Sequence, residues 1–227
     1  MLTKTTKTLA IDAECNPQTK ALDMTMMARC IALSRIAVAE GEYPFGTVIA
    51  LGGQVIVEAT NRTVRDADVT RHAEVIALSL AQKVLGRQQL RKCTLYSNVE
   101  PCAMCSFCIR ETGIGRVVYA IGSPVMGGLS RWNILRDESM SDRMPQVFCC
   151  VPEVVSGVML YEAEQVWQDW YPFGWQMIKL LGLLGVTRSE YDQIRTWPGY
   201  GQSIWRYIRS LFASISEVLR RPQRGAD

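Results

Sequence analysis

The chain has 227 residues, of which 48% are hydrophobic and 21% charged, and its formal net charge is +3. This composition is ordinary for a soluble globular protein, and the charge is too small to indicate by itself a nucleic-acid or membrane-binding protein. No apolar run reaches the roughly 18 residues of a membrane-spanning helix, and the opening residues MLTKTTKTLA lack a secretory pattern. We therefore expect a cytoplasmic protein, in which the eight cysteines are metal ligands or buried thiols rather than disulfides.

The amino-terminal part of the chain predicts an arm, a helix and a hairpin. Residues 1–20 are polar and without a pattern, so we expect a loose arm there. Apolar residues then recur at roughly helical spacing from Asp23 to about Glu40 and predict a helix. The β-branched segments 46–51 and 54–59 are separated by two glycines, which is typical of a β-hairpin.

The next part predicts a second helix and a third strand. A polar loop over residues 60–71 leads to a helix over about 72–85, which a glycine follows. Thr70 or Asp68 could cap the start of this helix, because short polar side chains accept hydrogen bonds from its first N–H groups. The short segment CTLYS, residues 93–97, predicts a strand.

The remaining elements complete an alternation of strands and helices. Pro101 opens a third helix, which Gly113 closes. The chain continues with strands at 116–122 and 151–157, a glycine-containing loop at 123–132, a short helix within 133–142 and a longer helix at 158–171. This alternation predicts an α/β layered domain. Because a helix is expected between the last two strands, those strands should run parallel.

Three residues have the spacing of metal ligands. Cys102 and Cys105 form a C-x₂-C pair at the start of the third helix, where the helix dipole stabilises anionic sulfur. His72, the only histidine of the chain, begins the preceding helix. Two helix starts that follow neighbouring strands lie at one sheet edge, so the three side chains can meet. Cys108 extends the run to C-x₂-C-x₂-C, as in iron–sulfur sites, but it lies off the ligand face and is expected to be a buried thiol.

A glutamate completes the pattern. Three protein ligands leave the fourth position of one zinc ion for a water or hydroxide, which is typical of a catalytic site. Glu74, two residues after His72, is not needed as a ligand and can carry a proton from that water to a substrate nitrogen. H-x-E followed by P-C-x-x-C, with a glutamate that is not a ligand, is the signature of the zinc deaminases.

The segments that carry a family resemblance extend from Pro44 to about Gly122. They are PFGTVIA (44–50), the Asn61 loop, TRHAEVIAL (70–78), LYSNVEPCAMC (95–105) and IGRVVYA (114–120). This stretch resembles the cytidine-deaminase-like superfamily, and within it the branch of guanine deaminases and tRNA-type adenosine deaminases. The resemblance implies a three-layer α/β/α domain with a mixed five-stranded sheet, and hydrolytic release of ammonia from an amino-substituted nucleobase-like ring.

The resemblance also implies residue roles. Asn61 would hydrogen-bond the substrate and the Ala73 backbone would orient it, although a turn asparagine is the alternative for Asn61. The implied substrate contacts are Phe45, Asn61, Ala73 and Pro101, with further contacts from Trp132 and Asp137. Structural alternatives for the last two are a core or interface tryptophan and a surface acid.

Two features favour a small substrate. The turn PFG at residues 44–46 is common in guanine deaminases. The segment SPVMGG at residues 123–128 lacks the lysine-containing turn that is usual in tRNA-type enzymes. Guanine or a related purine, a pterin or a triazine would suit the same chemistry. The alternatives are a tRNA-specific adenosine deaminase, which forms inosine, and a non-catalytic zinc-bearing binding protein, against which the presence of Glu74 argues.

The carboxyl-terminal segment has no counterpart in a minimal deaminase. We expect a catalytic domain over residues 21–172 and a helical extension over residues 173–227. Residues 174–186 are apolar but too short to span a membrane, so burial is expected. Residues 204–221 predict an arginine-bearing amphipathic helix that packs on the domain or across a homodimer, with RNA contact or a membrane surface as alternatives. The homodimer is an implication of the resemblance.

Overall fold

The computed structural model describes residues 16–185. Its helices are α1 (Pro17–Ala39), α2 (Ala73–Leu85), α3 (Arg87–Leu90), α4 (Ala103–Thr112), α5 (Glu138–Arg143), α6 (Leu160–Trp170) and α7 (Pro172–Leu180), with the 3₁₀ turn η1 (Ile134–Arg136). Its strands are β1 (Gly46–Leu51), β2 (Gln54–Thr60), β3 (Cys93–Val99), β4 (Arg116–Ile121) and β5 (Glu153–Ser156). The five predicted strands are all present.

The strands form one mixed sheet in the order β2-β1-β3-β4-β5. Strand β1 is antiparallel to both β2 and β3, while β3, β4 and β5 run parallel to one another. The parallel β4–β5 pair agrees with the expected helical connection, which contains η1 and α5. The mixed five-stranded sheet of the predicted fold class is confirmed.

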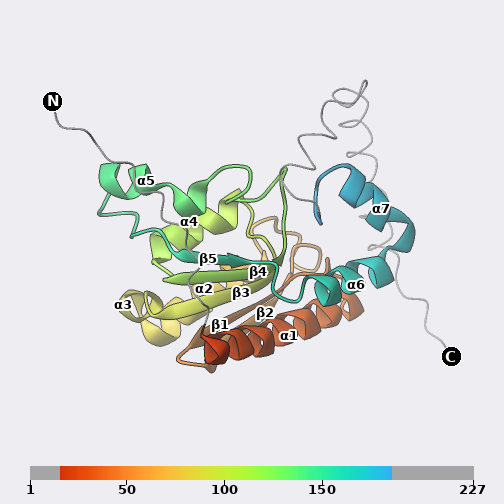
Figure 1. Cartoon of the computed structure of the whole chain (residues 1–227), viewed down its shortest axis with the longest axis horizontal. Helices are drawn as coiled ribbons and strands as arrows, with labels where there is room; N and C mark the ends of the chain where they lie inside the picture. The colour runs from red at the N-terminus through yellow and green to blue at the C-terminus, as the bar shows by residue number, and fades with distance from the viewer. Residues whose placement is uncertain (1–15, 186–227) are drawn as a thin grey trace, which may run out of the picture.

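Helices cover both faces of the sheet (Figure 1). Helices α1 and α6 pack on one face, and α2 and α4 lie on the other. Successive strand residues alternate between these two layers, because side chains of a strand point to opposite faces. In β1, for example, Val48 packs in the cluster of α1, and Ile49 packs in the cluster of α2.

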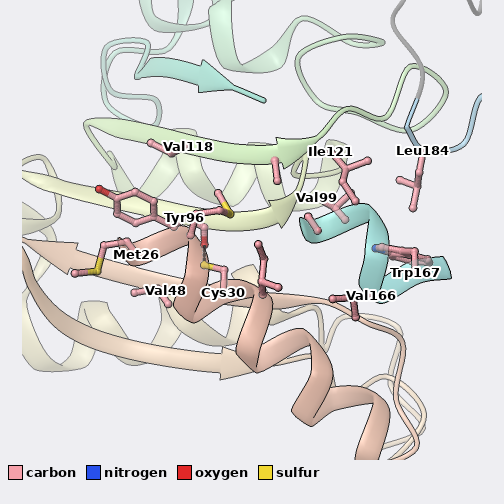
Figure 2. Close-up of a cluster of buried hydrophobic side chains, with 14 of the residues drawn as sticks. Met26, Cys30, Val48, Tyr96, Val99, Val118, Ile121, Val166, Trp167 and Leu184 are labelled. Carbon is pink, nitrogen blue, oxygen red and sulfur yellow. Dashed lines mark hydrogen bonds between the residues drawn. The ribbon is translucent and has the colours of Figure 1, made fainter. Parts of the chain in front are cut away.

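The cluster on the α1 side reaches the carboxyl ends of the central strands (Figure 2). Cys30 of α1 lies against Val48 and Tyr96 in the middle of the sheet. At the other end of the cluster, Trp167 of α6 and Leu184 extend it beyond the ends of β3 and β4. The same end of the sheet holds the candidate site described below.

Three local features differ from the sequence-based expectations. The first helix begins at Pro17, inside the predicted arm, with the Asn16 side chain accepting a hydrogen bond from the Gln18 N–H. The predicted caps of α2 are wrong, because His72 occupies the cap position and Asp68 accepts instead from the N–H and hydroxyl of Thr70. The single turn α3 was not predicted, since four residues are too few to show a helical period.

The described part of the expected extension packs against the domain. Trp175 and Ile178 of α7 are buried in the cluster of Trp167, and Leu183 and Leu184 follow them there. This agrees with the burial expected for residues 174–186 as far as the structure describes them. Within residues 16–185, no helix is long and apolar enough to cross a lipid bilayer. The helix expected over residues 204–221 lies outside the described residues.

Candidate metal centre and active site

The three predicted metal ligands converge at one edge of the sheet. His72 is the residue before α2, Cys102 is the residue before α4, and Cys105 lies in the first turn of α4. Helix α2 follows β2 and helix α4 follows β3. The expectation that these two strands are neighbours is wrong, because β1 lies between them. Both are antiparallel to β1, so they are parallel to each other and end at the same edge.

The donor set fits a tetrahedral zinc ion. The Sγ atoms of Cys102 and Cys105 are 3.6 Å apart, and they lie 3.6 and 3.4 Å from His72 Nδ1. Zn–S bonds of about 2.3 Å and Zn–N bonds of about 2.0 Å give a tetrahedron with edges of roughly 3.5–3.8 Å. Two sulfurs and one imidazole nitrogen at these separations are the ligands that zinc prefers.

Anionic sulfur is favoured at this position. The hydrogen bond with Cys105, followed by the contact with His72, lowers the pKa of Cys102 to about 4. The same hydrogen bond and burial raise the pKa of Cys105, so without an ion the pair holds one thiolate. Both residues lie at the amino terminus of α4, where the helix dipole stabilises negative charge. The contact with Cys102 raises the pKa of His72.

Glu74 lies beside the donors in the first turn of α2. It is buried, and burial, together with the nearby Cys102, raises the pKa of its carboxyl group. Its carboxyl group also interacts with the Cys105 thiol. A carboxyl group in such surroundings can both hold and release a proton, which is the property that acid–base chemistry needs.

A cavity of about 320 Å³ opens beside His72. Phe45 and Asn61 line it, as expected for substrate-contacting residues. Aromatic and aliphatic side chains form most of the wall, and none of the described lining residues is Lys, Arg, Asp or Glu. The lining residues that the sequence analysis did not single out are Tyr43, Thr63, Val69, Met126, Trp167, Trp170, Ile178, Leu183 and Leu184.

Asn61 is held by a buried carboxylate. Its Nδ2 donates to Glu42 Oε2 at 3.0 Å and to Thr63 Oγ1 at 2.7 Å. Its backbone N–H donates to the carbonyl of Phe45 at 3.1 Å, which joins the two cavity residues. Glu42 itself is fully buried. Glu42 is not recognisable from the sequence, because nothing in its context distinguishes it from a turn acid.

The loop after β4 is attached to the start of the metal helix by Glu100. Its carboxylate accepts from the backbone N–H groups of Ser123, Leu129 and Ser130 and from the Ser130 hydroxyl. These hydrogen bonds make Glu100 a residue that orients this region. The carbonyl of Pro101 accepts from the Gly128 N–H at 2.8 Å, so Pro101 too contacts this loop.

The other residues expected to contact the substrate lie in different settings. Ala73 is fully buried as the first residue of α2. The Asp137 carboxylate caps α5 by accepting from the N–H and hydroxyl of Ser139. Trp132 is 57% exposed, with the Arg131 guanidinium over its ring. Neither Trp132 nor Asp137 is among the described residues that line the cavity.

Known proteins resemble this chain over the same region. The model of the cytidine and deoxycytidylate deaminase zinc-binding region matches residues 20–121. A probable cytosine deaminase from Schizosaccharomyces pombe is 36% identical over 126 residues, which are 56% of this chain and 72% of the relative. A tRNA-specific adenosine deaminase from Agrobacterium fabrum is 32% identical over 134 residues, which are 59% of this chain and 88% of the relative.

Solved structures show the same fold. A structure from a study of A-to-I editing by tRNA:A34 deaminases has a TM-score of 0.56 and 30% identity, covering 63% of this chain and 98% of that chain. A guanine deaminase from Nitrosomonas europaea shares the fold, with a TM-score of 0.54 and 24% identity. The match covers 65% of this chain and 83% of that chain. A tRNA(Ile)-lysidine synthase from Deinococcus deserti is 35% identical over 146 residues, which are 64% of this chain. This chain spans only 26% of the length of that relative.

Proposed function

This chain belongs to the cytidine-deaminase-like superfamily of zinc-dependent deaminases, and on that premise we propose that it is a hydrolase that releases ammonia from a small amino-substituted heterocycle. One observation carries the proposal. His72 lines the cavity and forms a donor set spaced for zinc with Cys102 and Cys105, and the buried Glu74 lies beside these donors.

Each residue has a separate task in this proposal. His72 Nδ1 and the two thiolates hold the zinc, which when bound supplies Lewis acidity and lowers the pKa of water toward neutrality. Glu74 takes one proton from the attacking water and delivers it to a ring nitrogen. It then takes the second proton from the hydroxyl group now on the ring carbon and passes it to the amine, which leaves as ammonia while the carbonyl forms. Asn61 and the Ala73 backbone orient the ring, and Phe45 packs against it. Trp132 and Asp137 are given no task, since the Trp132 ring is mostly exposed and the Asp137 carboxylate caps α5.

The cavity supports a small, uncharged substrate. Its aromatic and aliphatic wall suits the face of a heterocyclic ring, and Asn61, Thr63 and His72 are among its polar side chains. A phosphate group would need a cation or a set of N–H donors, and no Lys or Arg is among the described lining residues. Guanine or a related purine, a pterin or a triazine meets these conditions.

A tRNA adenosine is the second candidate. It is favoured by the identity of 30–32% to tRNA-directed relatives, and by Arg62 and Arg71 on the loop whose Val69 lines the cavity. These two arginines both pair with Asp66, which reduces the charge that they can offer to a phosphate. A non-catalytic binding protein is the third, less supported candidate, because Glu74 is retained.

The setting in the cell and the assembly are also proposals. All seven cysteines among residues 16–185 are free, which suits a reducing compartment such as the cytoplasm. A homodimer through α2 and α4 is supported by the exposed apolar side chains of Leu80, Val84 and Phe107 on these helices. Light scattering on the purified full chain distinguishes a dimer from a monomer.

Ammonia release tests the substrate class. Zinc-loaded protein is incubated with free purine and pyrimidine bases, nucleosides, pterins, triazines and a tRNA anticodon stem. We expect release from at least one free heterocycle and none from the RNA. Release from the RNA alone would replace the proposed substrate by a tRNA adenosine, and zinc-loaded protein that releases ammonia from no compound would support the binding protein.

A further inference from the structure

We propose that Glu42 is a positioning residue that fixes the amide of Asn61, so that its carbonyl oxygen faces the cavity and the substrate must present a hydrogen-bond donor there. The proposal rests on the proposed function in one respect, that Asn61 contacts the substrate. It deepens that function, because it states which hydrogen-bonding edge the site selects.

Glu42 is buried without a cation among its hydrogen-bond partners in residues 16–185. Its carboxylate accepts from Asn61 Nδ2 at 3.0 Å, from the Val64 N–H at 3.2 Å and from the Arg65 N–H at 2.6 Å. The side chain is fully buried. Three donors directed at one carboxylate hold it in a single orientation.

This geometry determines which way the amide points. The oxygen and nitrogen of an asparagine side chain are distinguished by their hydrogen-bond partners, and a carboxylate can only accept. The NH₂ group of Asn61 must therefore face Glu42, and its second hydrogen is taken by Thr63 Oγ1. Both amide hydrogens are thus used within the protein, and the carbonyl Oδ1 is the group that Asn61 can offer to a ligand in the cavity.

An acceptor at this position selects substrates by chemistry. A ring N–H or an exocyclic amino group can donate to Oδ1, whereas a bare ring nitrogen would face another acceptor. A site built to hydrogen-bond one group discriminates strongly against the analogue that lacks it, since its buried polar atom is then left without a partner. The selected heterocycle therefore carries a donor on the edge that faces Asn61.

Glu42 also anchors the loop after Asn61 through Val64 and Arg65, so its positioning role must be separated from a structural one. Two variants do this. In Glu42→Gln, one of the two carboxylate oxygens becomes an NH₂ group. At the position of Oε2 this group faces Asn61 and should turn the Asn61 NH₂ toward the cavity. In the double variant Glu42→Gln/Asn61→Asp, the amide and carboxylate exchange places, and an oxygen faces the cavity again.

The first measurement needs no substrate. Side-chain NH₂ resonances of ¹⁵N-labelled, zinc-loaded protein are recorded, and the Asn61 pair is assigned by its loss in Asn61→Asp. We expect both hydrogens to exchange with water at least about 100-fold more slowly than those of an exposed asparagine, and to lose this protection in Glu42→Gln. Fast exchange in the unchanged protein would overturn the proposal even if the chain proves to be an active deaminase.

Kinetics on the best heterocycle of the substrate panel are the second measurement. We expect Glu42→Gln to raise KM by about 10-fold or more with a smaller change in kcat, and the double variant to restore KM to within about threefold. Glu40→Gln, the same change two residues away at a side chain that is 42% exposed, is the matched control. Equal loss in both Glu42 variants, with zinc retained, would reduce Glu42 to a structural residue.

Discussion

At the scale of single residues, the site depends on where three donors stand relative to helix starts. His72 and Cys102 each precede a helix, and Cys105 lies in the first turn of α4. The first N–H groups of a helix lack partners within the helix, and they carry the positive end of its dipole. The metal donors lie at these helix starts. Negative charge on the Cys102 sulfur is stabilised there, as its pKa of about 4 indicates.

Replacing one donor should remove the metal. We expect Cys102→Ser to lower zinc affinity by more than about 100-fold, because even losing a hydrogen-bond partner of a ligand costs 10–100-fold. Competition with a chromogenic chelator measures the affinity. Cys108→Ser is the control, since Cys108 is not part of the donor cluster among the described residues. Equal zinc loss in both variants would contradict the assignment of the ligands.

The lowered pKa of Cys102 makes a pH prediction. Above a pKa of about 4 the group is a thiolate, so alkylation of Cys102 in metal-free protein should stay nearly constant from pH 8 to pH 5 and fall only below that. Mass spectrometry of the labelled peptide follows the rate. An ordinary thiol with a pKa of about 8.5 would instead slow about tenfold per pH unit over this range, and that result would refute the stabilised thiolate. Added zinc should block the labelling.

The sequence predicted the ligands but not the groups around them. Fixed spacings in H-x-E and C-x₂-C follow from local helix geometry, so they can be read from neighbouring residues. Glu42 and Trp167 come from opposite ends of the domain. Only the folded chain brings Trp167 to the cavity wall and Glu42 to the lining residue Asn61. Asp137 was expected at the substrate, but its carboxylate serves as a helix cap, a local use that its sequence position also allows.

At the scale of elements, the loop after β4 and the start of α4 form one unit. The Glu100 carboxylate binds three backbone N–H groups of the loop, and Cys102 forms an isolated bridge with Gly127. The sequence indicated a glycine-containing loop here, but not its contact with Glu100. The glycines in this segment predict only a loop. Gly127 is required for a different reason, because the loop lies too close to the Glu100 carboxylate to leave room for a Cβ atom.

Gly127→Ala should therefore destabilise the protein. The added Cβ would collide with the Glu100 carboxylate, and overpacking of this kind costs about 1–3 kcal/mol. Urea unfolding followed by fluorescence measures the change. Gln82→Ala, at an exposed position of α2, should change stability by less than about 0.5 kcal/mol. A Gly127→Ala protein as stable as this control would mean that the loop does not lie against Glu100.

At the scale of the whole molecule, α6 and α7 build one wall of the cavity and continue the core. Trp167 and Trp175 stack at 6.2 Å, and Trp167 also meets Phe45 edge-on at 5.2 Å. The catalytic domain was proposed to end at residue 172, yet the core continues through Leu184. The apolar composition of residues 174–185 does not show where the domain ends. An added helix that packs on the domain and a helix that belongs to its core would both be apolar.

Two neighbouring aromatic residues of α7 test this packing. Trp175 is 2% exposed and Phe173 is 93% exposed. We expect Trp175→Ala to lower the free energy of unfolding by about 3–5 kcal/mol, and Phe173→Ala to change it by less than about 0.5 kcal/mol. Chemical denaturation of the two full-length variants provides the comparison. Similar values for both would show that α7 does not contribute to the core.

Ammonia release by zinc-loaded protein and by its Glu74→Gln variant, with zinc measured in both, tests the central claim most directly. The substrate is the best compound of the panel. We predict that the variant keeps its zinc and loses activity by about 10²–10⁴-fold, the usual contribution of a positioned proton carrier. An equally active variant would contradict the role of Glu74, and a fully zinc-loaded chain that releases no ammonia from any compound would contradict the deaminase itself.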